Sequence, residues 1–297
     1  MAEKKAGWLV VNRFLHTNKF SDIAARFTDS AARSGALLKL FTNDELLPEL
    51  GGGSALLPAE KPDFVLFYDK DILLAKQLER RGYRLFNSAR AIELCDDKSL
   101  THLALSGLVP MPRTVCAPFT YENIGYTDTA FIESMFALLG APLVIKEVCG
   151  SFGQQVYLAQ DRAEAEAILQ KVGGKRVIFQ EFIRESAGRD LRLNVVGGRV
   201  IAAMERWSET GDFRANITIG GSMKKHEPTP AEEALAIRTA KLLGLDFCGV
   251  DLLLTKSGPT VCEVNSNAHF KSIYDCTGVN AADAIMEHIL ASVGGRA

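Results

Sequence analysis

The sequence predicts a protein of mixed α/β and α+β class, in which a parallel α/β unit precedes units built from antiparallel hairpins. Near the N-terminus, short apolar runs alternate with helical patterns, as expected for parallel strands joined by helices. Later apolar runs are paired across short turn signals, which is typical of antiparallel hairpins. A hydrophobic content of 47% and a charged content of 24% are those of ordinary globular proteins.

Composition and charge exclude several function classes. A net charge of -2 gives no basic field that would attract nucleic acid or an anionic membrane. The cysteines form no Cys-x-x-Cys pair, which argues against a zinc site or a disulfide framework and favours a reducing compartment. No apolar run is long enough to span a bilayer, and the N-terminus lacks a signal core. We therefore expect a cytoplasmic protein that binds small molecules, and homo-oligomerisation is left open.

The N-terminal α/β domain is assigned to residues 1–95. Its expected elements alternate along the chain: strands at residues 7–12, 37–41 and 63–68, a helix from the cap Ser21 to Gly35, and a helix over residues 71–81. The first strand lacks a Gly-x-Gly-x-x-Gly after it, so a dinucleotide site is not expected. Asn12 follows that strand at the edge where open α/β sheets bind ligands, although a solvated loop residue would look the same.

Residues 96–182 are expected to form a linker helix and a small, lid-like α+β subdomain. The helix opens at Asp96 and ends near Gly107, and a Pro-containing connection follows at residues 109–112. The subdomain is expected to contain helices at residues 131–139 and 161–172 and strands at residues 142–146 and 176–181.

Lys146 lies inside an apolar strand pattern, where a lysine without a partner is rare, so it is expected to reach an anion. The loop at residues 150–156 contains two glycines and a serine, which free backbone N–H groups to approach phosphate oxygens. A lysine that extends from the strand end into solvent is the alternative interpretation.

The C-terminal subdomain is assigned to residues 183–297. Strands at residues 190–196 and 199–206 flank the turn Gly197-Gly198. A plain two-residue turn would point Arg206 away from the face that carries Arg192, so both arginines serve one site only if a bulge or twist intervenes. Helices are expected from the capping box at Thr229 to Leu243 and over residues 281–293.

A hairpin at residues 248–265 is the best candidate for a metal site. If it is centred on Ser257, Asp251 lies directly across from Glu263, and Asn265 shares their face. Two carboxylates and an amide oxygen held close together suit Mg²⁺, which also binds substrate phosphates. In the alternative register the two carboxylates face opposite sides as ordinary polar residues.

The ordered set of these motifs resembles the ATP-grasp superfamily, and most closely its RimK-like branch of α-L-glutamate ligases. The resemblance covers the chain from about Asn87 to the C-terminus. It is carried by the order and spacing of Lys98, Lys146, residues 180–183, residues 190–192, Arg206, residues 213–216, Asp251 and residues 263–265.

The resemblance implies an ATP-grasp fold, in which the N-terminal α/β domain precedes two α+β subdomains that clasp ATP. It also implies an ATP- and Mg²⁺-dependent ligase that joins a carboxylate to an amine through an acyl-phosphate. Two metal ions are expected, with Mn²⁺ as an alternative. The substrates would be an amino acid, peptide or peptide-like small molecule, with a glutamate-like residue added.

The site residues follow position by position. The implied nucleotide-binding residues are Lys98, Lys146, Ser151, Gly153, Gln180, Glu181, Phe182, Ile183, Asp190, Arg214, Ala215 and Asn216. The implied metal ligands are Asp251, Glu263 and Asn265, and the implied catalytic residues are Arg206, Arg214 and Asn265. The candidates for substrate contact are Arg192, Asn267, His269 and Lys271.

Two departures from the family pattern concern the phosphate loop and the acceptor. Gln155 stands where relatives usually have a second glycine, and residues 266–271 replace a small Pro- and Gly-containing loop. The second change puts the acceptor in doubt more than the chemistry. A small-molecule kinase on the same scaffold and a nucleotide-binding regulatory module without turnover are the competing interpretations.

Overall fold

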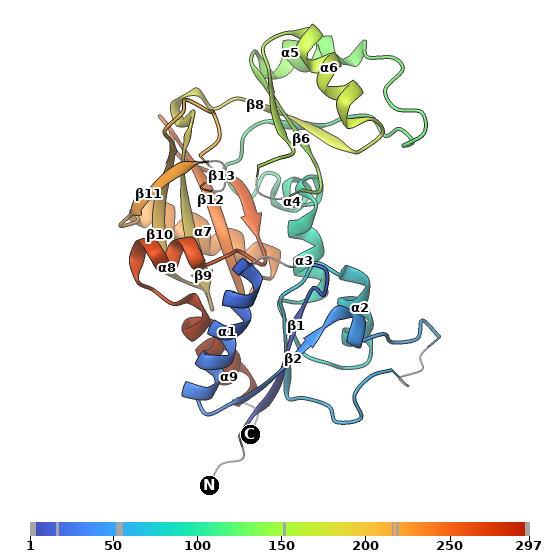
Figure 1. Ribbon diagram of the computed structural model, residues 1–297. Helices are drawn as coiled ribbons and strands as arrows, with labels where there is room; N and C mark the ends of the chain where they lie inside the picture. The colour runs from blue at the N-terminus through green and yellow to red at the C-terminus, as the bar shows by residue number, and fades with distance from the viewer. Residues whose placement is uncertain are drawn as a thin grey trace.

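The computed structural model describes residues 4–15, 18–51, 56–150, 153–215, 217 and 220–294. Three sheets of four, five and four strands organise this part of the chain (Figure 1). We call them the N-terminal sheet, the large sheet and the lid sheet.

The N-terminal sheet is parallel, as predicted. Its strand order is β2 (Leu37–Thr42), β1 (Ala6–Val11), β3 (Phe64–Phe67) and β4 (Leu85–Phe86). Its helices are α1 (Asn18–Arg33), α2 (Ile72–Arg80) and α3 (Ala89–Asp96), and a short 3-10 turn spans Asn43–Glu45. The Ser21 cap is wrong, because α1 begins at Asn18 and Ser21 lies within its first turn. The helix expected over residues 71–81 is α2, which Asp71 caps by accepting a hydrogen bond from the Leu74 N–H.

The lid sheet is antiparallel and lies at the top of Figure 1. Its order is β5 (Thr114–Cys116), β8 (Val177–Glu181), β6 (Leu143–Glu147) and β7 (Val156–Ala159). Helices α5 (Phe131–Leu139) and α6 (Arg162–Val172) pack on it around a separate core that includes Ile132 and Phe179. Helix α4 (Lys98–Leu105) leads into this unit from α3.

The large sheet carries most of the site. Its order is β11 (Gly221–Lys225), β10 (Arg199–Ser208), β9 (Arg189–Val196), β12 (Phe247–Thr255) and β13 (Gly258–Asn265). Helix α7 (Pro230–Leu243) covers one face, and its capping box at Thr229 and left-handed Gly244 confirm both predicted ends. A 3-10 turn at Arg184–Ser186 precedes β9. Helices α8 (Lys271–Thr277) and α9 (Ala281–Gly294) follow β13.

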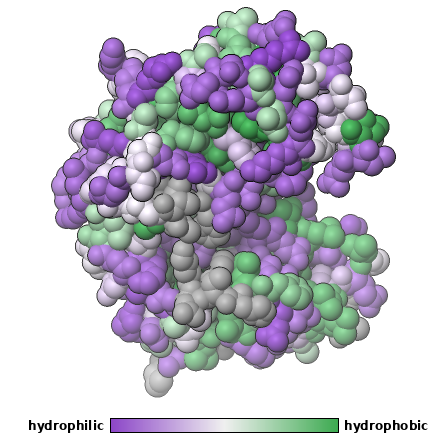
Figure 2. Space-filling model, turned by 45° about the horizontal axis from the view of Figure 1, so that its top comes forward, coloured by the Kyte–Doolittle hydropathy of each residue, from purple (hydrophilic) through white to green (hydrophobic). Residues whose placement is uncertain are grey.

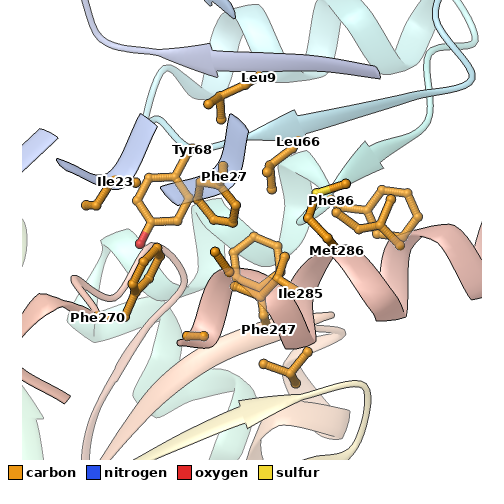
Figure 3. Packing of buried hydrophobic residues seen from close by; sticks show 14 of the residues in the cluster. Leu9, Ile23, Phe27, Leu66, Tyr68, Phe86, Phe247, Phe270, Ile285 and Met286 are labelled. Atoms are coloured by element: carbon orange, nitrogen blue, oxygen red, sulfur yellow. The ribbon is translucent and has the colours of Figure 1, made fainter. Parts of the chain in front are cut away.

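An aromatic core joins the N-terminal sheet to the C-terminal helices. Figure 3 shows Tyr68, Phe27 and Phe270 packed together, with Leu66 above Phe247 and α9. The Tyr68 hydroxyl donates to the Ala268 carbonyl at 2.6 Å, so the end of β3 is tied to the segment after β13. The carboxyl edge of the N-terminal sheet therefore faces the end of the β12–β13 hairpin.

No helix in the described part of the chain is long and apolar enough to cross a membrane. The domain boundaries expected after residues 95 and 182 stay predictions.

Candidate functional site

A cavity of about 820 Å³ collects residues from the lid sheet, the large sheet and the segments that follow β1 and β3. Figure 2 shows the surface notched between the upper and lower parts of the molecule. The predicted site residues that line the cavity are Lys146, Gly153, Gln180, Glu181, Phe182, Ile183, Asp190, Arg192, Arg206, Arg214, Ala215, Asp251, Glu263, Asn265, Asn267, His269 and Lys271. Lys98 lies just outside the lining, and Ser151 and Asn216 fall outside the described residues.

Four alternating charges cross the floor of the cavity. Arg192 donates two hydrogen bonds of 2.6 Å to Asp251, and Arg206 donates two of 2.6 Å to Asp190. Arg206 also lies 3.1 Å from the second carboxylate oxygen of Asp251. A bulge between Val200 and Ala202 explains this geometry, because it sets Arg206 opposite Asp190 and brings both arginines to one face.

The arginines control the charge of the floor. Burial would raise the pKa of Asp251, but the guanidinium groups of Arg192 and Arg206 outweigh it and hold that pKa below its usual value. The pKa of Asp190 is raised, because burial and the nearby Asp251 carboxylate outweigh Arg206. Carboxylates fixed by bidentate arginines keep one geometry, which gives the floor a preorganised pattern of charge.

Asp251 lies directly across from Glu263, as predicted. The turn is tighter than predicted, since Thr255 pairs with Gly258, and a bulge at Cys262 then restores the Asp251–Glu263 pairing. Glu263 is 3.7 Å from the Lys98 ammonium. The Asn265 side-chain nitrogen is buried without a hydrogen-bond partner among the described residues.

The chemistry of this donor set suits Mg²⁺, and because Arg192 and Arg206 engage both Asp251 oxygens, a metal ion would share or replace those pairs. Two carboxylates and one amide at the end of a hairpin supply hard oxygen ligands and leave positions for water and phosphate. In the part of the chain that the structure describes, no group of three His, Cys, Asp or Glu side chains could hold a metal. The third protein ligand would therefore be the Asn265 amide oxygen, whereas the unpartnered Asn265 nitrogen is a donor that could bind water or a substrate oxygen.

Lys146 is nearly buried at 6% exposure on β6. Its nearest recorded contact is the Cys262 sulfur at 3.7 Å, and no carboxylate lies within 4.0 Å of it among the described residues. Burial and the Lys146 charge lower the pKa of His102 to about 4, so that histidine is neutral at pH 7. A buried cation beside a neutral histidine needs an anion, in agreement with the phosphate contact expected for Lys146.

Arg214 links the lid to the large sheet. Its guanidinium donates to the Gly153 carbonyl at 2.8 Å, and it pairs with Asp212 at 2.7 Å. The Gln155 side chain packs against Gly150, since a Cβ at Gly150 would lie 2.7 Å from the Gln155 amide oxygen. Gln155 therefore fills space beside Gly150 that a glycine would leave open.

The end of β8 forms an apolar wall of the cavity. The Gln180 amide donates to the Thr114 hydroxyl at 2.9 Å, and the Glu181 carboxylate accepts from the Arg113 N–H at 2.7 Å. Both side chains are thus hydrogen-bonded within the lid. A planar ligand ring would therefore contact the main chain of this strand end and not these two side chains. Phe182 and Phe213 lie with ring centroids 6.2 Å apart on the same wall.

Asp69 is a cavity residue that the sequence reasoning missed. It lies two residues beyond the end of β3 and is 6% exposed. The signal was available, because an acidic residue directly after a buried parallel strand lies at the edge where such sheets bind ligands. The position of Asn12 after β1 predicts a residue at this same edge, and its amide donates to both Asp69 oxygens at 3.1 Å.

Comparison with known proteins gives one consistent family. The model of the RimK-like ATP-grasp domain matches residues 98–289. A probable alpha-L-glutamate ligase of Thioalkalivibrio sulfidiphilus (strain HL-EbGR7) is 36% identical over 245 residues, which are 81% of this chain and 77% of the relative.

Solved structures share the fold. The RimK domain ATP-grasp protein of Sphaerobacter thermophilus gives a TM-score of 0.71 at 24% identity, covering 95% of this chain and 98% of that one. The ATP-grasp ligase PsnB, solved with a phosphomimetic variant of its minimal precursor, Mg and ADP, gives a TM-score of 0.71 at 17% identity, covering 98% of this chain and 99% of that one.

Proposed function

Because the chain belongs to the RimK-like ATP-grasp family, and is an ADP-forming ligase that makes carbon–nitrogen bonds, we propose that it activates a carboxylate with Mg²⁺ and ATP through an acyl-phosphate. An amine then displaces phosphate and forms the amide. We propose that the residue added is glutamate-like and that its partner is an amino acid, a peptide or a peptide-like small molecule. The probable glutamate ligases among the relatives support this choice.

The observation that carries the proposal is the distribution of charge around one cavity. Lys146 and Arg214 lie on the lid side of the cavity and supply cations, whereas Asp251, Glu263 and Asn265 lie across from them on one hairpin. Phosphoryl transfer depends on positioning and on neutralisation of charge rather than on covalent help from the protein. Cations facing a set of hard oxygen ligands provide both.

Each part of the site has a task. Lys98, Lys146 and Arg214 would bind phosphate oxygens, and the main chain of β8 with Phe182 and Ile183 would hold the adenine. Asp190, the implied ribose ligand, has both carboxylate oxygens engaged by Arg206, so ribose binding would share or replace that pair.

Asp251, Glu263 and Asn265 would hold one or two Mg²⁺ ions, which neutralise phosphate charge when bound. Arg206 contacts both Asp190 and Asp251, so it is placed to steady negative charge that develops between nucleotide and metal. The Arg214 contact with Gly153 connects the phosphate loop to the floor, so nucleotide binding would draw the lid toward the large sheet and exclude water.

ATP-dependent hydroxamate formation tests the proposal. Hydroxylamine replaces the amine, and a panel of amino acids, short peptides and other carboxylates is screened with Mg²⁺ and ATP. We expect a hydroxamate from at least one carboxylate, with phosphate released in step. Asp251→Asn and Glu263→Gln should both abolish the signal.

Glu233→Gln is a matched control, because Glu233 lies in the first turn of α7 and does not line the cavity. It should keep full activity. Phosphate transfer to a hydroxyl without amide formation would instead favour a kinase, and Mg·ATP binding without any turnover would favour a regulatory module.

A further inference from the structure

Asp69 is a buried carboxylate that faces the cavity from outside the matched family domain. Its two oxygens accept hydrogen bonds of 3.1 Å from the Asn12 amide, and one also accepts from the Lys70 N–H at 2.7 Å. These are neutral donors, which fix the carboxylate but leave its charge uncompensated. The family model begins at residue 98, so neither Asp69 nor Asn12 belongs to the ATP-grasp domain itself.

Asp69 differs in this respect from the other nearly buried carboxylate of the cavity. Asp251 is 5% exposed and is held by two arginines. Asp69 is 6% exposed, yet no lysine, arginine or histidine lies within 4.0 Å of its oxygens among the described residues. The adjacent Lys70 pairs with Asp96. A buried negative charge without a counter-charge favours a cation from outside the chain.

Asn267 offers a second hydrogen-bond acceptor next to Asp69 in the lining of the cavity. Its amide nitrogen donates to the Asp69 main-chain carbonyl at 2.8 Å, and its side-chain oxygen is buried without a partner among the described residues. Asn267 also lines the cavity, two residues after the predicted metal ligand Asn265. Asp69 and Asn267 therefore offer oxygen acceptors in a region close to the reaction centre.

The aromatic core holds the segments that carry Asp69 and Asn267 in place. The Tyr68 hydroxyl, which Figure 3 shows beside Phe270, is bonded to the Ala268 carbonyl at 2.6 Å. The Arg192 side chain passes over Gly249 on the same side as Ala268, at 3.7 Å from the position of a Gly249 Cβ. Arg192 lines the same cavity with its guanidinium paired to Asp251, so a substrate carboxylate would share that pair. Oxygen acceptors and a guanidinium in one cavity match the ammonium and carboxylate ends of an amino acid.

We propose that Asp69 and Asn267 form the subsite that binds the amino group of the amine substrate, so that this substrate enters as a primary ammonium and releases one proton to water before its nitrogen attacks the acyl-phosphate. The inference rests on the proposed ligase function. The subsite would make the N-terminal domain, through Asp69, share the selection of the amine with the ATP-grasp domain, which contains Asn267. Neutral amines without three N–H donors would gain little from it.

Hydroxylamine provides the test, because it is small and largely uncharged at neutral pH and needs no ammonium subsite. Asp69→Asn keeps the size of the side chain and removes its charge. With the full chain, Mg²⁺ and ATP, this variant should form hydroxamate at the wild-type rate, which also reports correct folding. The KM for the best L-amino acid amine should rise by about tenfold or more, the effect of losing one charged hydrogen bond.

Asp63→Asn is the matched control. Asp63 precedes the same strand at its opposite end and pairs with Lys5, away from the cavity, so both reactions should stay unchanged. The proposal is overturned if hydroxamate and amide formation fall together in Asp69→Asn, which would assign Asp69 to the carboxylate substrate, or if neither changes.

Binding separates this inference from the proposed function. If wild-type protein gives no hydroxamate with any carboxylate, the ligase mechanism fails. Calorimetry with L-glutamate, Mg²⁺ and AMPPNP still decides on the subsite: wild type should bind L-glutamate about tenfold more tightly than Asp69→Asn, and glutarate, which lacks the ammonium, equally weakly in both. Equal L-glutamate affinity in both proteins would rule the subsite out.

Discussion

Replacing Asn87 by alanine should destabilise the protein strongly, because this one side chain joins three segments. Asn87 is fully buried just after β4. Its amide nitrogen donates to the Phe247 carbonyl at 2.9 Å and the Ser266 carbonyl at 3.0 Å. Its oxygen accepts from the Asp246 N–H at 2.7 Å and the Phe247 N–H at 3.2 Å. The Asn87 side chain therefore fixes the start of β12 and the segment after the β12–β13 hairpin.

The magnitude follows from those contacts. Four buried hydrogen bonds at about 1 kcal/mol each predict a loss of about 4 kcal/mol in the free energy of unfolding. At about 2 °C for each kcal/mol in a chain of this size, the Tm should fall by about 8 °C. Urea and thermal unfolding followed by circular dichroism measure both quantities. Asn43→Ala is the control, since the Asn43 oxygen accepts one bond from the Arg13 N–H near the surface, and it should cost about 1 kcal/mol or less. An Asn87→Ala loss no larger than that of Asn43→Ala would refute the reasoning.

Two further predictions concern the lid side of the cavity. The folded protein holds the pKa of His102 at about 4 instead of 6.5, so the unfolded chain binds more protons between these values and stability should fall as the pH drops through this window. The loss should reach about 3 kcal/mol, and His102→Gln should flatten the dependence of the urea midpoint on pH; an unchanged slope would count against it. Lys146→Met should raise the calorimetric Kd for Mg·ATP by about tenfold or more, because the phosphate loses a buried cationic partner, and an unaltered Kd would exclude that contact.

Regular elements were predictable where local signals mark both ends. Helix α7 begins at a capping box and ends at a left-handed glycine, and its bounds follow from those residues. Helix α1 lacked so clear a start, and it begins three residues before the predicted cap. Helices α3 and α8 and strand β11 are short and were not predicted, because tertiary packing rather than a strong sequence pattern stabilises them.

The site was predictable in its residue types and less so in its registers. The β9–β10 and β12–β13 registers that position the site depend on bulges, one between Val200 and Ala202 and one at Cys262. No residue type in the sequence predicts either bulge. The prediction set Asp251 across from Glu263 by assuming a looser turn, and the bulge produced the same pairing from a tighter one. The question left open for Arg206 is answered by the first bulge.

Pairings between distant segments were out of reach. The Asp251 carboxylate is matched by two arginines, one of them 59 positions earlier in the chain, and nothing in the sequence selects those partners. The contact of Asp69 with Asn267 spans 198 positions. The first contacts arise within the assembled large sheet, and the second arises only when the N-terminal sheet docks on it, so neither is visible in the unfolded sequence.

The most direct test of the acyl-phosphate is oxygen transfer. A carboxylate substrate that gives a hydroxamate is labelled with ¹⁸O, and the phosphate released during amide formation is analysed by ³¹P NMR. Attack of the carboxylate on the γ-phosphorus carries one labelled oxygen into each phosphate, and this is the predicted result. Released phosphate without label would contradict the account, because the carboxylate oxygen would never have been bonded to phosphorus.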